Sequence, residues 1–257
     1  MFKAYFDRSE LGDPAAVMTV SGYLSSDDRW QEFEPSWHRV LGALGVEMLH
    51  MTEFECRLGS FRSGDDETRF SFIGQLIDLV GRHAFVGVGA AIVLGDYDAL
   101  EEDDRRLLGH PYAMCGLKAV ADTLRWIDQT IEKAASTGEW AVSEKGKSVP
   151  VEFVFEAGDE GHGELAEQLR KEQASGMFAG RIVGWSFQDK RGVGALQAAD
   201  FAAYETTKQL VRTIGAEERA MRKSLERFVA NTPYVAEYFN TRSMGDVLER
   251  VRREGTA

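Results

Sequence analysis

The sequence contains few cysteines and no long apolar run, and both absences exclude whole classes of protein. Only Cys56 and Cys115 occur among the 257 residues, far apart and in no metal-ligand spacing. We therefore expect a reducing compartment and no zinc site. No stretch at the N-terminus resembles a signal peptide, and no apolar run approaches transmembrane length. The sequence thus predicts a cytoplasmic protein without a membrane segment.

Positive charge is also scarce. The chain has 30 lysines and arginines against 42 aspartates and glutamates, which gives a net charge of −12. This balance argues against non-specific binding of duplex nucleic acid over a broad basic face. The balance is compatible with a nucleic-acid enzyme that has a local strip of basic residues. Several of the carboxylates could also hold divalent cations, which would offset part of the negative charge.

Strand-like and helix-like segments alternate along the chain, with no internal repeat and no low-complexity segment. Alternating or continuous apolar runs predict strands at residues 2–7, 16–24, 47–51, 84–94, 149–156 and 181–187. Apolar residues at three- and four-residue intervals predict helices at residues 26–45, 67–80, 111–135, 164–174 and from Gly194 onward. The helix at 67–80 is expected to bury one stripe of Phe70, Ile73, Leu76, Ile77 and Val80.

Interleaved strands and helices indicate an α/β protein whose mixed sheet is flanked by helices. The first two strands are expected to form an antiparallel hairpin, and helical crossovers favour parallel pairing of later strands. We expect one main domain over residues 1–215 and a helical C-terminal extension over residues 216–257, broken at Pro233 and packed on the same domain. Residues 136–148 are the most linker-like stretch. The amphipathic C-terminal helices could form the face of a homodimer.

The stretch from Gly194 to Tyr204 predicts a helix that packs closely against a sheet. Its sequence, GALQAADFAAY, surrounds a single carboxylate with alanines. Helical spacing places Gln197, Asp200 and Tyr204 on one face. A carboxylate buried there needs a partner, which could be a base, a hydrogen-bond network or a metal ion.

Two further acids occupy comparable positions, because Asp7 ends the first expected strand and Glu156 ends a central apolar strand. Ligands gather at the carboxyl ends of strands in open α/β sheets, so these two acids and Asp200 could converge. Crowded carboxylates repel one another unless protons or cations intervene, and oxygen ligands suit Mg²⁺ or Mn²⁺. Such a cluster activates water and stabilises the leaving oxygen in phosphodiester cleavage, often with two ions about 4 Å apart. Glu10 and Asp159 lie near enough in sequence to supply further ligands.

Each acid also has a plain structural explanation. Asp200 could bond to nearby backbone or to a lysine or arginine, and Asp7 could stabilise a hairpin turn. Glu156 could simply begin the glycine-rich turn that follows it. His50 could be a packed strand residue or a base beside the cluster.

Polar residues near the last helix have similar alternatives. Gln197 could satisfy a backbone group or contact substrate. Lys190 and Arg191 precede the Asp200 helix, where they could form a solvated loop or contact a phosphate backbone.

Several motifs together resemble the DUF3800 family. They are Tyr5-Phe6-Asp7, Gly22-Tyr23 with the Trp30 to Trp37 helix, His50-Met51, His110-Pro111-Tyr112-Ala113-Met114-Cys115, Phe153-Val154-Phe155-Glu156 and, as the most specific, Leu196-Gln197-Ala198-Ala199-Asp200. The resemblance covers roughly residues 2–210. It implies a ribonuclease H-like fold and, with that fold, a metal-dependent nuclease or polynucleotidyl transferase. By position, Asp7 matches the family's first-strand acid and Asp200 its helix acid.

The sequence departs from the family pattern at two positions. The family usually shows Asp-Glu-Ser-Gly where this chain has Asp-Arg-Ser-Glu, so Arg8 stands in place of an acid. The central strand of the family more often ends in aspartate, and here it ends in Glu156. Arg8 could neutralise the cluster, contact a phosphate or mark a site that has lost metal affinity.

The first functional hypothesis is therefore a Mg²⁺- or Mn²⁺-dependent nuclease acting on DNA or RNA, in a mobile-element or phage-defence setting. Its expected catalytic residues are Asp7, Glu156 and Asp200. Its expected metal ligands are Asp7, Glu10, Glu156 and Asp200. The residues expected to bind substrate are Arg8, His50, Lys190, Arg191 and Gln197.

Two other hypotheses use the same residues. A catalytically degenerate binding or assembly module could keep the fold, and the net negative charge and Arg8 favour it. A small-molecule phosphohydrolase could use the same acids on a different substrate.

Overall fold

The computed structural model describes residues 1–12, 16–137, 149–215 and 220–254. Its strands are β1 (Phe2–Leu11), β2 (Val17–Ser26), β3 (Val86–Val93), β4 (Val151–Glu156), β5 (Ile182–Gln188) and β6 (Tyr234–Phe239). Its longer helices are α1 (Asp27–Ala43), α3 (Asp66–His83), α6 (Pro111–Thr137), α7 (His162–Ser175), α8 (Gly194–Ile214), α9 (Lys223–Asn231) and α10 (Thr241–Glu254). Its short helices are α2 (Met51–Cys56), η1 (Gly59–Phe61), α4 (Leu94–Asp98) and α5 (Glu102–Leu108). The expected linker at 136–148 lies almost wholly outside the described residues.

The described strands form one mixed sheet with the order β5-β4-β1-β2-β3-β6. β2 pairs antiparallel with both β1 and β3. The remaining pairs, β1 with β4, β4 with β5 and β3 with β6, are parallel. The α/β class and the initial hairpin are therefore as the sequence predicted. The parallel pairing expected of the later strands holds for β4 and β5, but it is wrong for β3, which pairs antiparallel with β2 although helices connect the two.

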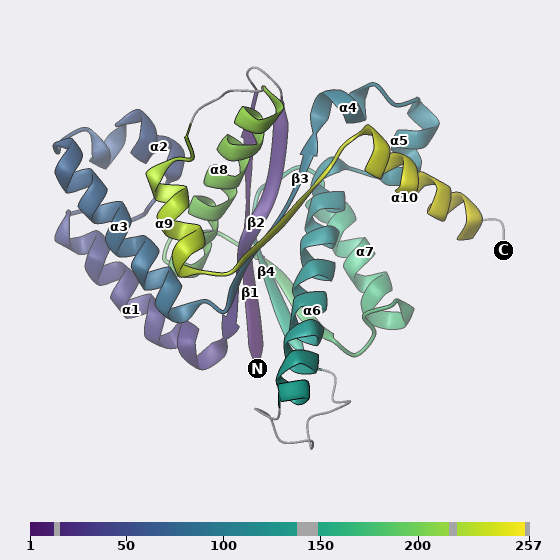
Figure 1. Ribbon diagram of the computed structural model, residues 1–257, viewed down its shortest axis with the longest axis horizontal. Helices are drawn as coiled ribbons and strands as arrows, with labels where there is room; N and C mark the ends of the chain where they lie inside the picture. Colours follow the sequence, from purple (N-terminus) through teal and green to yellow (C-terminus); the bar gives the residue numbers. More distant parts are fainter. Residues whose placement is uncertain (13–15, 138–148, 216–219, 255–257) are drawn as a thin grey trace.

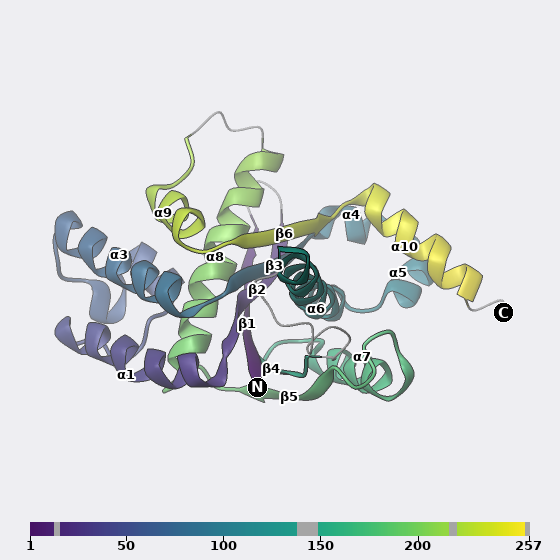
Figure 2. The same cartoon turned by 60° about the horizontal axis from the view of Figure 1, so that its bottom comes forward.

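Helices cover both faces of this sheet (Figure 1, Figure 2). On one face α8 packs directly on β1 and β2, with α1, α3 and α9 grouped on the same side of the molecule. On the other face α6 packs on β2 and β3, and α7 packs on α6 and β5. Within the described part of the chain, no helix is both long and apolar enough to cross a membrane.

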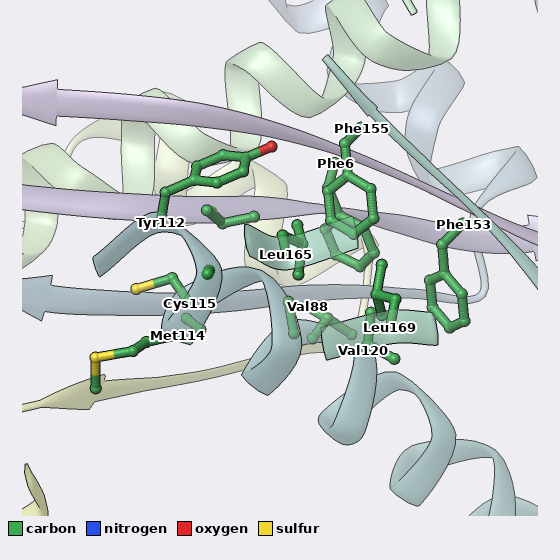
Figure 3. Close-up of a cluster of buried hydrophobic side chains, with 14 of the residues drawn as sticks. Phe6, Val88, Tyr112, Met114, Cys115, Val120, Phe153, Phe155, Leu165 and Leu169 are labelled. Atoms are coloured by element: carbon green, nitrogen blue, oxygen red, sulfur yellow. The ribbon is translucent and has the colours of Figure 1, made fainter. Parts of the chain in front are cut away.

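The core beneath α6 aligns the ends of β1 and β4 (Figure 3). Phe6 and Phe155 are partners in the parallel register of these strands, and their rings stack with centroids 5.5 Å apart. Tyr112, in the first turn of α6, is buried in the same cluster. Stacked, fully buried aromatic rings hold the two strands in one register. Asp7 and Glu156, the next residues along each strand, therefore lie next to each other where the pairing of β1 and β4 ends.

The close packing predicted for the alanine-rich helix is confirmed. Every residue of α8 from Gly194 to Glu205 is buried. Small side chains allow the helix backbone to approach β1 and β2 closely, because almost no side-chain volume separates them. At the start of the helix, a Cβ on Gly194 would come within 2.7 Å of the Trp37 ring, so glycine is required there.

The strand predicted at residues 47–51 is wrong. Residues 48–50 have no regular structure, and Met51 begins α2. Side chains from α8, not a neighbouring strand, satisfy the backbone here: the amide of Leu49 donates to Gln197 Oε1, and the amide of Met51 donates to Asp200 Oδ2. A short apolar run cannot reveal that its hydrogen-bond partners are distant side chains.

The prediction that residues 216–257 form a wholly helical extension is also wrong. Pro233 is followed by β6, which pairs with β3 and completes the sheet. Gly87 makes this pairing possible, since a Cβ there would come within 2.4 Å of the Tyr234 ring. Residues 216–257 thus contribute a strand to the sheet of the main domain.

One member of the expected apolar stripe on α3 lies outside it. Ile73, Leu76 and Ile77 are buried as expected, but the side chain of Phe70 is 57% exposed. The buried face of α3 instead includes Phe72, which packs against Phe54 and Phe61. Phe70 is therefore an exposed aromatic side chain on the outer part of α3.

Candidate functional site

Asp7, Glu156 and Asp200 do meet, and the element that each occupies explains why. Asp7 and Glu156 directly follow the register pair of Phe6 and Phe155, so parallel pairing delivers both carboxylates to one end of the sheet. Asp200 lies in the second turn of α8, which packs on β1. Two strands and one helix thus bring three acids together from positions nearly 200 residues apart.

The centre of this acid cluster is the ammonium group of Lys190. Its Nζ lies 3.0 Å from Asp7 Oδ2, 3.0 Å from Glu156 Oε2 and 3.6 Å from Asp200 Oδ2. Lys190 belongs to the loop between β5 and α8, and its side chain is only 11% exposed. Three formal negative charges therefore face one formal positive charge, which leaves a surplus of two negative charges at a buried point.

Burial and the neighbouring charges both shift the pKa values of the cluster. Burial raises the pKa of Asp7 well above its usual value, and the neighbouring Glu156 and Asp200 raise it further. Burial also raises the pKa of Asp200, although Lys190 and the Met51 amide oppose the rise. Burial alone would lower the pKa of Lys190, but the three carboxylates outweigh it and raise that pKa, so the ammonium stays charged at neutral pH.

Gln197 is fully buried and organises the surroundings of Lys190. Its Oε1 accepts hydrogen bonds from the Trp37 ring and from the Leu49 amide, both at 3.0 Å. Its Nε2 donates to the backbone oxygen of Lys190, also at 3.0 Å. The side-chain amide is thus used within the protein, and its role is to fix the loop that carries Lys190 and the segment before α2.

Glu34 is a polar residue of this region that the sequence analysis did not identify. Its carboxylate accepts hydrogen bonds from the amides of Gly194 and Ala195, the first two residues of α8. No side chain at the preceding residue caps this helix, so a carboxylate from α1 supplies the cap. Only its helical spacing from Trp30 and Trp37 places Glu34 near the buried face of α1, and that signal does not reveal its partner.

Arg8 and Glu10 form an outer group beside the acid cluster. Arg8 pairs with Glu10 and, through Nη1, with Asp159 Oδ1 at 3.2 Å. Burial raises the pKa of Asp159, and the guanidinium of Arg8 opposes the rise. Arg8 therefore neutralises acids, as the sequence suggested, but the acids are Glu10 and Asp159 and not the three around Lys190. Glu10, expected as an accessory metal ligand, points to Arg8.

His50 and Arg191 flank the cluster on the outside. His50 is partly exposed and immediately precedes Met51, whose amide binds Asp200. A positive charge on His50 would lower the pKa of Asp200, so the imidazole lies within electrostatic reach of that carboxylate. Arg191 is exposed and paired with Asp189, which leaves it at the surface beside the Lys190 loop.

No group of three or more carboxylate, imidazole or thiolate side chains is already arranged to hold a metal ion in the parts of the chain that the structure describes. The three acids instead surround an ammonium ion. The sequence placed Lys190 near the site as a phosphate-binding residue and did not reveal that it lies between the acids. No spacing rule relates it to Asp7, because 183 residues separate the two.

No family model, curated protein or solved structure matches this chain. Membership of the DUF3800 family therefore stays a prediction, and the site must be interpreted from its own geometry.

Proposed function

We propose that this protein is a metal-dependent nuclease, a hydrolase that cleaves phosphodiester bonds of DNA or RNA. The observation that carries the proposal is the acid cluster itself: three carboxylates from β1, β4 and α8 share one cation, which leaves a formal surplus of two negative charges, and burial together with this surplus raises the pKa of Asp7. Burying unbalanced charge is costly, and a fold tolerates that cost most readily where the charge has a function.

The arrangement of the sheet supports a ribonuclease H-like fold for this proposed enzyme. An antiparallel β1-β2-β3 unit is extended by the parallel strands β4 and β5, with helices on both faces. The acids lie on the first strand, on its parallel neighbour and on the helix that follows β5. This is the placement that the resemblance to the DUF3800 family implies.

The residues present fit a divalent cation. Asp7, Glu156 and Asp200 would hold Mg²⁺ or Mn²⁺, since their oxygens already surround one positive charge and carboxylate oxygens are preferred ligands of these ions. When bound, such an ion acts as a Lewis acid that activates water and stabilises the leaving oxygen. Exchange of the ammonium for one divalent ion would also halve the surplus, from two formal negative charges to one.

Lys190 has a second role in this proposal. Its side chain has four rotatable carbons and extends from a loop, so its ammonium can leave the acids when a cation replaces it. It would then neutralise a phosphate of the substrate beside the cluster. Gln197 holds the backbone of Lys190 in place, which restricts the ammonium to positions near the acids.

Cleavage assays with labelled single- and double-stranded DNA and RNA, in Mg²⁺ or Mn²⁺, test the proposed function. Asp200→Asn is expected to abolish cleavage because the amide loses the charge that holds the cation. Asp122→Asn is a matched control, since Asp122 is also a buried aspartate in an ion pair but lies on α6. Full activity in the Asp200→Asn protein would overturn the assignment.

One observation favours a second function, a binding or assembly module without catalysis. The ammonium of Lys190 already lies between the three carboxylates. A lysine that had replaced a lost metal ion would occupy the same position. Calorimetric titration with Mn²⁺ separates the two functions. Binding that disappears in Asp200→Asn supports the nuclease, whereas no binding at millimolar Mn²⁺ leaves only the module.

A further inference from the structure

A basic depression lies between α2, α3 and α9, outside the acid cluster. It consists of two adjoining pockets of about 330 and 420 Å³, which share Phe70, Ile73, Lys223 and Ser224. Pockets of this size suit a small ligand or one unit of a larger one. The helices that line it, α2, α3 and α9, lie on the side of the molecule opposite α7 (Figure 1, Figure 2).

Basic side chains gather around the depression, although the chain as a whole is acidic. Four of them line the first pocket, Arg57, Arg69, Arg222 and Lys223, against two acids, Glu55 and Asp66. The second pocket adds Glu67 and Arg227, and Arg227 is paired with Asp78. An anion can therefore be attracted only by those cations that have no carboxylate partner.

Two of these cations are available to a ligand. Arg57 pairs with Asp66, and Arg222 pairs with both Glu55 and the buried Glu205. Among the residues that the structure describes, no carboxylate pairs with Arg69 or Lys223. The guanidinium of Arg69 lies 4.2 Å from the centroid of the Phe54 ring and donates to two backbone oxygens, of Phe54 at 2.5 Å and of Phe61 at 3.5 Å. It is thus held in a fixed position without losing its charge.

An exposed aromatic ring completes the depression. Phe70, next to Arg69 in sequence, is 57% exposed and lines both pockets. Proteins that bind single-stranded nucleic acid combine basic grooves with aromatic rings on which bases stack. A paired base in a duplex presents no free face to such a ring, so this combination selects an unpaired strand.

The depression is connected to the acid cluster through α2. The amide of Met51, the first residue of this helix, binds Asp200, and residues at its other end line the depression. A helix of six residues is about 9 Å long, a separation that a few nucleotides of a strand can span. One strand can therefore contact both places.

From these contacts we infer that the depression is a subsite for single-stranded nucleic acid: Lys223 and Arg69 bind a phosphate group and the ring of Phe70 stacks on a base. The inference rests on the proposed nuclease function for the identity of the ligand, and it adds the strandedness of the substrate and a second contact point.

Binding without catalysis tests the subsite. The probe is a fluorescein-labelled twelve-residue oligothymidylate, measured by fluorescence anisotropy in EDTA at low salt, where no metal-dependent cleavage occurs. Phe70→Ala is expected to weaken binding about five- to a hundredfold, whereas Phe70→Tyr keeps the stacking surface and binds within about twofold of the original chain. Lys223→Gln is expected to reduce the slope of log K against log salt by about 0.7, as one phosphate contact does on a single strand.

Matched changes on other surfaces serve as controls. Tyr238→Ala removes an exposed aromatic side chain from β6, and Lys171→Gln removes an exposed lysine from α7. Both are expected to leave oligothymidylate binding unchanged. The subsite is overturned if Phe70→Ala binds as well as the original chain, if the controls weaken binding equally, or if the original chain does not bind. Melting temperatures verify that the Phe70 and Lys223 variants are folded.

The oligothymidylate-binding experiment and the nuclease assay can fail separately. Cleavage that depends on Asp200 but is unaffected by Phe70→Ala refutes the subsite and keeps the nuclease. Binding that depends on Phe70 in a chain that cleaves no substrate refutes the nuclease and keeps the subsite.

Discussion

Replacing Lys190 with methionine tests whether the acid cluster depends on a cation at its centre. Methionine approximates the length of lysine and removes only the charge. Because the ammonium contacts three carboxylates and is almost buried, its removal leaves those charges without a partner. Breaking a buried ion pair in this way costs about 3–5 kcal/mol. For a chain of this size, that loss lowers the melting temperature by about 6–10 °C.

A divalent cation is expected to restore part of this stability. With the ammonium gone, Mn²⁺ can enter among Asp7, Glu156 and Asp200 without displacing another charge. At a concentration a hundred times its dissociation constant, a ligand of the folded state adds about 2.7 kcal/mol, which corresponds to about 5 °C here. Scanning calorimetry of Lys190→Met in EDTA and in millimolar Mn²⁺ measures both effects.

Lys118→Met is the matched control for this experiment. Lys118 also bridges two carboxylates, the buried Asp122 and the exposed Glu237, but it lies on α6. Its loss is expected to lower stability with no recovery in Mn²⁺. The reasoning about Lys190 is refuted if Lys190→Met melts at the original temperature, or if Mn²⁺ stabilises both methionine variants equally.

Two further predictions concern buried polar groups near the site. Gln197→Leu leaves the Trp37 ring nitrogen and the Leu49 amide without acceptors. Each unsatisfied buried donor costs about 1–3 kcal/mol of the free energy of unfolding, so the midpoint of urea unfolding should fall. An unchanged midpoint would contradict the positioning role of Gln197. Burial raises the pKa of Glu205, although Arg222 opposes the rise. Between its unfolded pKa of about 4.3 and that higher folded pKa, the folded state binds more protons, so the free energy of unfolding falls as pH rises. Glu205→Gln should therefore flatten the fall in melting temperature above pH 4.5, and a profile parallel to that of the original chain would show that Glu205 is not responsible.

Much of the fold could be predicted from apolar patterns, because most strands and helices bury the residues that their periodicity marks. The runs at β3 and β4 are buried on both faces, and the helix at Gly194 begins where its glycines indicate. The failures have physical causes outside these patterns. The run before Met51 has its amides bound by α8 side chains, and β6 depends on space at Gly87 that only the folded sheet reveals.

The acids of the site could be predicted for the same reason, whereas their cation could not. Asp7 and Glu156 follow apolar strands, and the ends of parallel neighbours meet. Lys190 lies in a polar loop whose sequence also suits a solvated turn. Its position among the acids depends on the hydrogen bond from Gln197 to its backbone oxygen, which no local pattern encodes. Charged loop residues beside a predicted acid cluster therefore have to be considered as its counter-ions.

The two proposed sites would have complementary electrostatic roles. The acid cluster, with its formal surplus of negative charge, would repel a phosphate strand until a divalent cation offsets part of that charge. The basic depression, where Arg69 and Lys223 have no carboxylate partner among the described residues, is proposed to bind the same strand without any metal. Binding and cleavage are therefore expected to respond differently to metal, because a strand can be held at Phe70 and Lys223 while the acids remain closed around Lys190. Such a division would allow an acidic protein to bind nucleic acid at one small site and to act on it only when the cation arrives.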